Sequence, residues 1–418
     1  MLYTALPASG DPYNAFFNPR CFFMMSAWLL PEHIADVLPV QARRVEELRR
    51  LMLDRARSYG FELVIPPLLE HLESLLSGTG RELDLKTFKL VDQLSGRLLG
   101  VRADTTPQAA RIDAHLLNHD GVTRLCYCGP VLHTRADGLR ATREPLQLGA
   151  EIFGHAGLEA DLEAQELALD CLHEAQIDEL VIDLADARIL RGVVQAWALT
   201  PAELNDLAKA LSEKDSAAVA ALSANADSTT QHALQTLMHL YGGTEVIALA
   251  RTELPQNALI SASLDQLEWL ATHLRAAYPH LRVGFDLSDM SGYAYYSGAR
   301  FAIYGPQSSD ALARGGRYDE VGAVFGRRRP AVGFSLDLKT LAEAARPLPA
   351  ANAVLAPWSE DPGLRAAVRR LRAQGQTVLS VLPGHQPEAQ AFECDRELAF
   401  DCGQWVLRSL SAQAQMIS

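Results

Sequence analysis

The segment from Arg143 to His155 limits the fold most, because its side chains alternate in type with a period of two. One set of positions is apolar: Leu146, Leu148, Ala150 and Ile152. The opposite set holds Gln147, Gly149 and Glu151. Successive side chains of a strand point to opposite faces of a sheet, so the pattern predicts a strand with one packed face. An amide and a carboxylate flanking a glycine suggest a small cationic ligand on the other face as one hypothesis, while an ordinary polar sheet surface is the more common meaning of such a pattern.

The chain of 418 residues exceeds the usual size of one domain, so two or three units are expected. We expect residues 1–25 to be a disordered extension, or sequence upstream of a later start at Met24 or Met25. A core over 26–345 is predicted to contain a helical insertion at about 200–280. After a proline-containing linker, residues 351–418 are expected to form a small α/β domain. No stretch approaches the roughly 20 apolar residues of a membrane span, so the sequence predicts a cytoplasmic protein.

The formal net charge of -13 works against a large polyanion such as tRNA as partner, because phosphate contacts supply most non-specific affinity. The six cysteines lack the spacing of a disulfide scaffold. Cys126 and Cys128 share one face of an apolar run, and packed thiols are favoured there over a metal site. We expect no metal and no cofactor.

Local patterns predict the elements around the polar strand. A helix over 39–59 stops at Gly60, and a strand follows over 61–65. Asp104-Thr105-Thr106-Pro107 is typical of a helix start with Thr106 as N-cap, and it also directs Asp104 and Thr106 beyond a strand end. Strands are predicted over 281–287 and 291–304, a turn at Gly315-Gly316, and a helix starting near Gly333.

Five motifs, in this order, resemble those of histidyl-tRNA synthetases, a class II aminoacyl-tRNA synthetase family, over nearly the whole chain from about residue 28. They are Ile65-Pro66-Pro67, Arg102-Ala103-Asp104-Thr105-Thr106, Gln147-Leu148-Gly149-Ala150-Glu151, Gly292-Tyr293-Ala294-Tyr295-Tyr296 and Gly315-Gly316-Arg317-Tyr318-Asp319. The resemblance implies an α+β core in which helices flank an antiparallel sheet. It also implies that six side chains contact histidine: Asp104, Thr106, Gln147, Glu151, Tyr295 and Tyr296.

Three positions depart from the synthetase motifs, because each lacks the arginine that the family places around ATP. The second motif has Leu132-His133-Thr134-Arg135 where synthetases have Phe-Arg-x-Glu. Ser291 stands where a catalytic arginine leads the Tyr-Tyr signature, and Thr340 stands where an arginine meets the γ-phosphate. Loss of one such electrostatic group often costs roughly 10²–10³ in rate, so the resemblance implies no catalytic residues in this chain.

A synthetase-like chain with a retained histidine pocket is similar to the regulatory subunits of ATP phosphoribosyltransferase, the first enzyme of histidine biosynthesis. The match over 142–151 is especially close. That resemblance implies a non-catalytic dimer that joins a short catalytic subunit, in an expected hetero-octamer, and carries feedback by L-histidine. The interface with the catalytic subunit is the alternative position for histidine. An active histidyl-tRNA synthetase, or a tRNA-binding paralogue without aminoacylation, is the alternative function.

Overall fold

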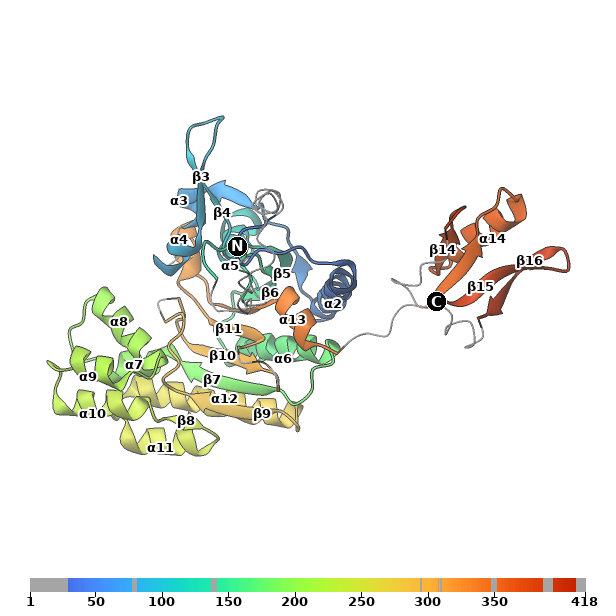
Figure 1. Cartoon of the computed structure of the whole chain (residues 1–418). Helices are drawn as coiled ribbons and strands as arrows, with labels where there is room; N and C mark the ends of the chain where they lie inside the picture. Colours follow the sequence, from blue (N-terminus) through green and yellow to red (C-terminus); the bar gives the residue numbers. More distant parts are fainter. Residues whose placement is uncertain are drawn as a thin grey trace, which may run out of the picture.

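The computed structural model describes residues 29–76, 81–136, 141–293, 295–306, 308, 310–346, 352–385 and 394–410. The extension expected over 1–25 lies outside these residues. Figure 1 shows a large sheet flanked by helices and, apart from it, a small unit built from the last strands. No helix of the described residues is long and apolar enough to cross a bilayer.

The large sheet has nine strands in the order β1-β5-β6-β12-β11-β10-β7-β9-β8. Their bounds are β1 Glu62–Leu63, β5 Thr123–Pro130, β6 Leu146–Phe153, β7 Val181–Asp186, β8 Tyr241–Gly242, β9 Arg282–Asp286, β10 Ala299–Tyr304, β11 Ala313–Arg317 and β12 Ala331–Asp337. From β5 to β7 in this sheet order, each strand pairs antiparallel with the next, which confirms the predicted antiparallel sheet. The pairs β1–β5 and β7–β9 near its two ends are parallel.

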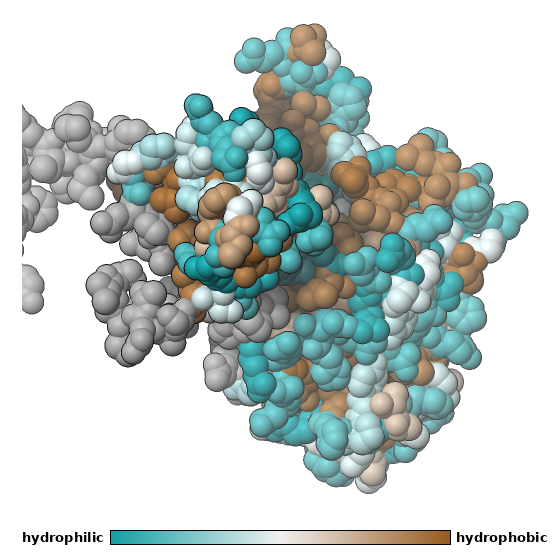
Figure 2. All heavy atoms as spheres, turned by 90° about the vertical axis from the view of Figure 1, so that its right-hand side faces the viewer, coloured by the Kyte–Doolittle hydropathy of each residue, from teal (hydrophilic) through white to brown (hydrophobic). Residues whose placement is uncertain are grey.

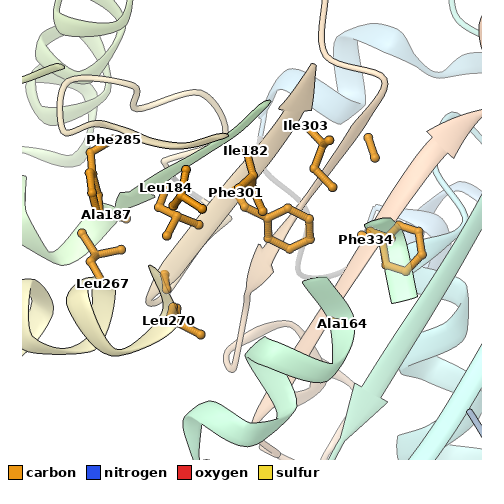
Figure 3. Packing of buried hydrophobic residues seen from close by; sticks show 14 of the residues in the cluster. Ala164, Ile182, Leu184, Ala187, Leu267, Leu270, Phe285, Phe301, Ile303 and Phe334 are labelled. Carbon is orange, nitrogen blue, oxygen red and sulfur yellow. The ribbon is translucent and has the colours of Figure 1, made fainter. Parts of the chain in front are cut away.

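One face of the sheet is apolar and carries the main core. The pairing aligns Ala150, Phe334, Gly315, Phe301 and Leu184 in one row across five strands. Figure 3 shows Phe301, Leu184 and Ile182 packed near Leu267 and Leu270. The helices that contact this face are α2 (Pro39–Ser58), α6 (Leu158–Glu174), α12 (Ala258–Ala277) and α13 (Leu338–Ala344). The apolar half of the Arg143–His155 pattern therefore packs as predicted.

Helix α2 confirms the prediction over 39–59 to within one residue. Its buried residues recur at helical spacing: Val45, Leu48, Met52 and Ala56. Gly60 follows the helix with φ +84°, a backbone conformation that favours glycine. The strand predicted over 61–65 is shorter, since only Glu62 and Leu63 pair with β5.

A second, three-stranded sheet joins β2 (Leu69–His71), β4 (Leu98–Val101) and β3 (Phe88–Val91) in that order. The short helices α3 (Leu72–Leu75) and α4 (Arg81–Lys86) lie between β2 and β3 in the chain. Helix α5 (Thr106–Arg111) follows β4 and continues as the π-helical segment η2 (Ile112–Leu117). Its N-cap is Thr105, one residue before the predicted Thr106, and no side chain caps it.

The insertion expected at about 200–280 is mostly helical but not entirely so. After α7 (Ala187–Val193), it contains α8 (Pro201–Ser212), α9 (Ser216–Leu222), α10 (Ser228–Leu237), α11 (Glu245–Glu253) and α12. Gly242 of the Gly242-Gly243 break belongs to β8, which pairs antiparallel with β9. The prediction of an all-helical insertion was wrong at this point, because a strand of two residues leaves no periodic pattern.

Three further local predictions were wrong. The strand predicted over 291–304 begins only at Ala299, and the residues before it form turns. Gly315 and Gly316 lie inside β11 and not in a turn. Gly333 lies in β12, and the helix α13 starts at Leu338. Strands with this much glycine resemble turns when their partners in the sheet are unknown.

The last elements form a separate four-stranded sheet in the order β14-β13-β15-β16. It comprises β13 (Ala353–Pro357), α14 (Pro362–Ala373), β14 (Thr377–Val381), β15 (Cys394–Asp401) and β16 (Gln404–Ser409). These elements have a hydrophobic cluster of their own, in which Leu364, Val368 and Leu371 of α14 pack against Val354 and Leu398. Strands and a helix thus follow the predicted α/β pattern.

Candidate functional site

The face of the large sheet opposite the main core is polar and hollowed. The pairing places Glu151, Gly333, Gly316 and Arg300 in one row of this face. The adjacent row runs through Tyr127, Gly149, Ser335, Arg314 and Ala302. A cavity of about 160 Å³ lies above these rows. A cavity of about 150 Å³ holds a benzene-sized molecule, so this space can take a small ring.

Glycines on the polar face of the sheet leave space that a side chain at the same positions would fill. A Cβ on Gly333 would lie 1.7 Å from Glu151 Oε2 and 2.4 Å from the Ala150 carbonyl oxygen. A Cβ on Gly149 would lie 2.4 Å from the Tyr127 hydroxyl oxygen. The room above Gly149 is therefore taken by the side chain of Tyr127.

Replacement of Gly333 by alanine is expected to lower the free energy of unfolding by about 1–3 kcal/mol, the usual effect of overpacking. The added Cβ would collide with Glu151, whose carboxylate is held by two tyrosines. Urea unfolding measures the change. Gly121→Ala is the matched control, because nothing lies within 4 Å of a Cβ there. An equal loss in both variants would contradict this reading of the glycine.

Glu151 is the most deeply buried ionisable group in the cavity, with 1% of its surface exposed. Tyr127 donates a hydrogen bond to its Oε1 at 2.9 Å, and the Tyr318 hydroxyl donates to its Oε2. Burial raises the pKa of Glu151 to about 8, although both hydroxyl contacts favour the carboxylate. The group is thus mostly protonated at neutral pH when the cavity holds no ligand, and a bound N–H donor would favour its ionisation.

Asp104 stands at the other acidic position of the cavity and is half-buried. The Gln147 amide donates to its Oδ1 at 2.8 Å, and the Thr106 backbone N–H donates to the same oxygen at 3.1 Å. The side-chain amide oxygen of Gln147, Oε1, accepts from the Thr105 N–H at 2.9 Å. Gln147 thus positions Asp104 and is not among the side chains that line the cavity, so its predicted contact with histidine stays a prediction.

Thr106 links the two acidic positions. Its hydroxyl lies 2.9 Å from the Tyr127 hydroxyl, which in turn binds Glu151. The threonine thus serves the polar network, whereas the sequence had also suggested an N-cap.

Tyr295 and Tyr296 cover the cavity from the segment before β10. The Tyr295 ring stacks on Tyr318 at 5.0 Å between ring centres and meets Tyr296 edge-on at 5.5 Å. The Tyr295 hydroxyl is buried and has no hydrogen-bond partner among the described residues. Such a group favours a ligand that supplies the missing partner. Five of the six predicted histidine contacts thus line one cavity: Asp104, Thr106, Glu151, Tyr295 and Tyr296.

The three positions that lack the synthetase arginines are held by local hydrogen bonds. The His133 ring nitrogen Nε2 donates to the Ala103 carbonyl oxygen at 2.9 Å. Ser291 donates to Asp289 at 2.7 Å, and Thr340 donates to Asp337 at 2.7 Å. None of these side chains carries the permanent charge of a guanidinium.

Sequence reasoning missed two side chains of this site, Tyr127 and Arg314, and it named Tyr318 within a motif without giving it a role. A signal for Tyr127 existed, because a tyrosine within an apolar strand needs a partner for its hydroxyl when buried. Arg314 was hidden by the prediction of a turn at the following glycines. Among the described residues, no group of three or more His, Cys, Asp or Glu side chains could hold a metal ion.

Comparison with known proteins gives two family matches along this chain. The histidyl-tRNA synthetase family matches residues 33–341, and the ATP phosphoribosyltransferase subunit HisZ C-terminal domain matches 351–408. The ATP phosphoribosyltransferase regulatory subunit of Verminephrobacter eiseniae (strain EF01-2) is 59% identical over 386 residues, which is 92% of this chain and all of that relative. The chain belongs to the family of ATP phosphoribosyltransferase regulatory subunits.

A further member of this family and two solved structures are also similar to the chain. The regulatory subunit of Bordetella pertussis (strain Tohama I / ATCC BAA-589 / NCTC 13251) is 53% identical over 389 residues, or 92% of this chain and all of the relative. A structure titled as an ATP phosphoribosyltransferase regulatory subunit/histidyl-tRNA synthetase from Bacillus halodurans C has a TM-score of 0.74 at 25% identity, covering 86% of this chain and 94% of that one. Histidyl-tRNA synthetase from Nostoc sp. PCC 7120 shares the fold, with a TM-score of 0.73 at 18% identity over 93% and 98% of the two chains.

Proposed function

We propose that this regulatory subunit is not itself an enzyme and serves as the histidine sensor of an ATP phosphoribosyltransferase complex. In this proposal the chain is required for the activity of a short catalytic subunit that joins ATP to phosphoribosyl pyrophosphate. The cavity lined by two acidic groups, Asp104 and Glu151, carries the proposal. Membership of the regulatory-subunit family supports the same role.

L-histidine is the ligand that suits this cavity best. Its α-ammonium and imidazole N–H are both hydrogen-bond donors, and Asp104 and Glu151 offer acceptors for them. Tyr295 and Tyr318 present stacked rings beside Glu151, where a flat imidazole can pack. The buried Tyr295 hydroxyl adds a further polar contact.

An active histidyl-tRNA synthetase is the weaker candidate. Activation of an amino acid by ATP needs positioned cations around the triphosphate, and His133, Ser291 and Thr340 do not supply them. Asp337 adds a negative charge beside Thr340. The net charge of -13 also disfavours tRNA as a ligand. Histidine-dependent exchange of pyrophosphate into ATP by the purified chain would overturn the regulatory proposal.

Self-association as a dimer belongs to the same proposal. Large apolar side chains remain exposed around β1 and on the three-stranded sheet: Leu63, Ile65, Leu68, Leu69, Leu90, Val91, Leu94 and Leu98. Figure 2 shows brown apolar atoms on the projection at its top, where the β3–β4 hairpin lies in Figure 1. Exposed apolar patches of this kind mark interaction surfaces. Pairs of this chain would then join the catalytic subunit in a cytoplasmic hetero-oligomer, with a hetero-octamer as the expected size.

The proposed regulation is a coupling between two sites. Histidine would bind differently to the active and inhibited states of the complex, and such couplings amount to about 1–3 kcal/mol, or roughly 5–150-fold in affinity. The interface with the catalytic subunit is the competing position for the sensor.

Reconstitution with a short catalytic subunit tests the function. We expect phosphoribosyl transfer to ATP to rise strongly when this chain is added, and L-histidine to inhibit the complex. The Glu151→Ala complex should keep the activation and lose the inhibition. If its sensitivity to histidine is unchanged, the sensor lies elsewhere; if the chain does not activate the catalytic subunit, the regulatory function is wrong.

A further inference from the structure

The acidic groups of the cavity suit only the hydrogen-bond donors of an amino acid, so the α-carboxylate of such a ligand still needs a partner. Asp104 and Glu151 are the acidic lining groups, and both suit the donor groups of the ligand. An amino acid at neutral pH also carries an α-carboxylate, which needs donors or a cation. The position where the synthetases place an arginine after β9 holds Ser291, whose hydroxyl already donates to Asp289.

Arg314 is the one Lys or Arg side chain lining this cavity among the residues that the structure describes. It is exposed, and it forms no hydrogen bond or ion pair with the described part of the chain. Two other arginines, one on the neighbouring strand β10 and one on β11 itself, are already engaged. Arg300 pairs with Asp289 at 2.8 Å, and Arg317 pairs with Asp161. Arg314 thus has its donors available for a ligand.

The sheet places Arg314 on the face of the acidic groups. It pairs opposite Ser335 of β12 and Ala302 of β10, so its immediate neighbours across the sheet are small. Ser335 in turn pairs opposite Gly149, two residues from Glu151 on β6. Two strand spacings of about 4.8 Å and two residues of about 3.3 Å separate the Arg314 and Glu151 backbones by roughly 12 Å. That distance leaves room for a molecule the length of an amino acid between the two side-chain ends.

We propose that Arg314 of β11 binds the α-carboxylate of the amino-acid ligand and so replaces the arginine missing at position 291, which lies in the turn before β10. The inference rests on the proposed histidine pocket and adds the group that makes it selective for a ligand with a free carboxylate. A planar guanidinium binds a carboxylate through two parallel hydrogen bonds. The pocket then has an acceptor for each donor end of histidine and a cation for its anionic end.

Two ligands and two variants test Arg314. L-histidine and L-histidinol, in which a hydroxymethyl group replaces the carboxylate, are titrated calorimetrically into the wild-type chain, Arg314→Gln and Arg314→Lys. We expect Arg314→Gln to weaken L-histidine binding at least about tenfold, with a smaller loss in Arg314→Lys. Binding of L-histidinol should be the same in the wild-type chain and in Arg314→Gln. Arg365→Gln, which removes an exposed arginine on α14, is the control and should change neither ligand.

The outcomes separate the inference from the function on which it rests. If Arg314→Gln binds L-histidine as tightly as the wild-type chain does, the assignment of Arg314 is overturned and the pocket is retained. If both ligands weaken equally in Arg314→Gln, the residue acts on the fold and not on the carboxylate, which also overturns the assignment. If the wild-type chain binds neither ligand, the proposed function fails together with the inference.

Discussion

Glu151→Gln is expected to stabilise the fold at alkaline pH while abolishing histidine binding. The carboxyl is buried, and its pKa is raised from 4.5 to about 8. In the unfolded chain the same group ionises near its ordinary pKa. Between these two values the folded state keeps a proton that the unfolded state releases, so the wild-type fold loses stability as pH rises. This loss of folding stability is absent below the pKa of the unfolded chain and complete above the pKa of the folded chain.

A glutamine at this position removes that loss, because it does not ionise. Each pKa unit corresponds to 1.36 kcal/mol, so the stability of Glu151→Gln relative to wild type should rise by about 3–5 kcal/mol between pH 4 and pH 9. Urea unfolding at a series of pH values measures it. Glu62→Gln, which changes an exposed strand glutamate, is the control and should show no such trend. A flat difference between Glu151→Gln and wild type would show that Glu151 is already ionised in the folded chain.

Asp161→Ala is expected to lower the free energy of unfolding by about 3 kcal/mol, because it removes the buried counter-charge of the Arg317 guanidinium and leaves only the longer ion pair with Asp319 at 3.4 Å. Asp161 and Arg317 are 1% and 8% exposed, and Arg317 Nε donates to Asp161 Oδ2 at 3.1 Å. The pair joins α6 to β11, and Tyr318 follows directly in the chain. Histidine binding should weaken as well, since Tyr318 donates to Glu151.

Asp120→Ala is the matched control for the buried pair. Asp120 forms an ion pair with Arg327 at 2.8 Å but is fully exposed, so urea unfolding should register only a small change. The double variant Asp161→Leu/Arg317→Met should recover much of the loss, because no buried charge is left unpaired. Equal effects of Asp161→Ala and Asp120→Ala would refute the role given to the buried pair.

The parts of the fold that the sequence predicts are those set by local patterns. The β6 alternation placed Glu151 on the polar face and Leu148 in the core, and the structure confirms both. The stripe on α2 likewise predicted its buried residues. These patterns repeat within one element, so they can be recognised in the sequence when the neighbouring elements are unknown.

The parts that failed depend on partners far away in the chain. Gly333 faces Glu151 across 182 positions of sequence, and only the pairing of β12 with β6 reveals why it must be glycine. Tyr127 reaches Glu151 from the neighbouring strand β5, and Tyr318 reaches it from the residue after β11, so both partners are identified only by the pairing of distant strands. Arg314 was passed over because glycines after it suggested a turn. Register between distant strands is not encoded in periodicity alone.

The resemblance to histidyl-tRNA synthetases implied the identity of the ligand, which the spacing of polar residues along β6 did not. Periodicity raised a small cationic ligand near Gln147 and Glu151 as one hypothesis, and the resemblance of the motifs implied that this ligand is histidine. The structure then changed the part of Gln147, which holds Asp104 by a hydrogen bond of 2.8 Å. It also revealed a cation, Arg314, in a pocket where the motif comparison had found only losses.

Calorimetric titration of L-histidine into the purified chain tests the pocket most directly. The account predicts saturable binding to the wild-type chain and none to a folded Glu151→Gln variant. It also predicts proton release on binding near neutral pH, visible as a heat that depends on the buffer, because Glu151 must ionise to accept the ligand. Unchanged binding in Glu151→Gln, or no binding by the wild-type chain, would contradict the account.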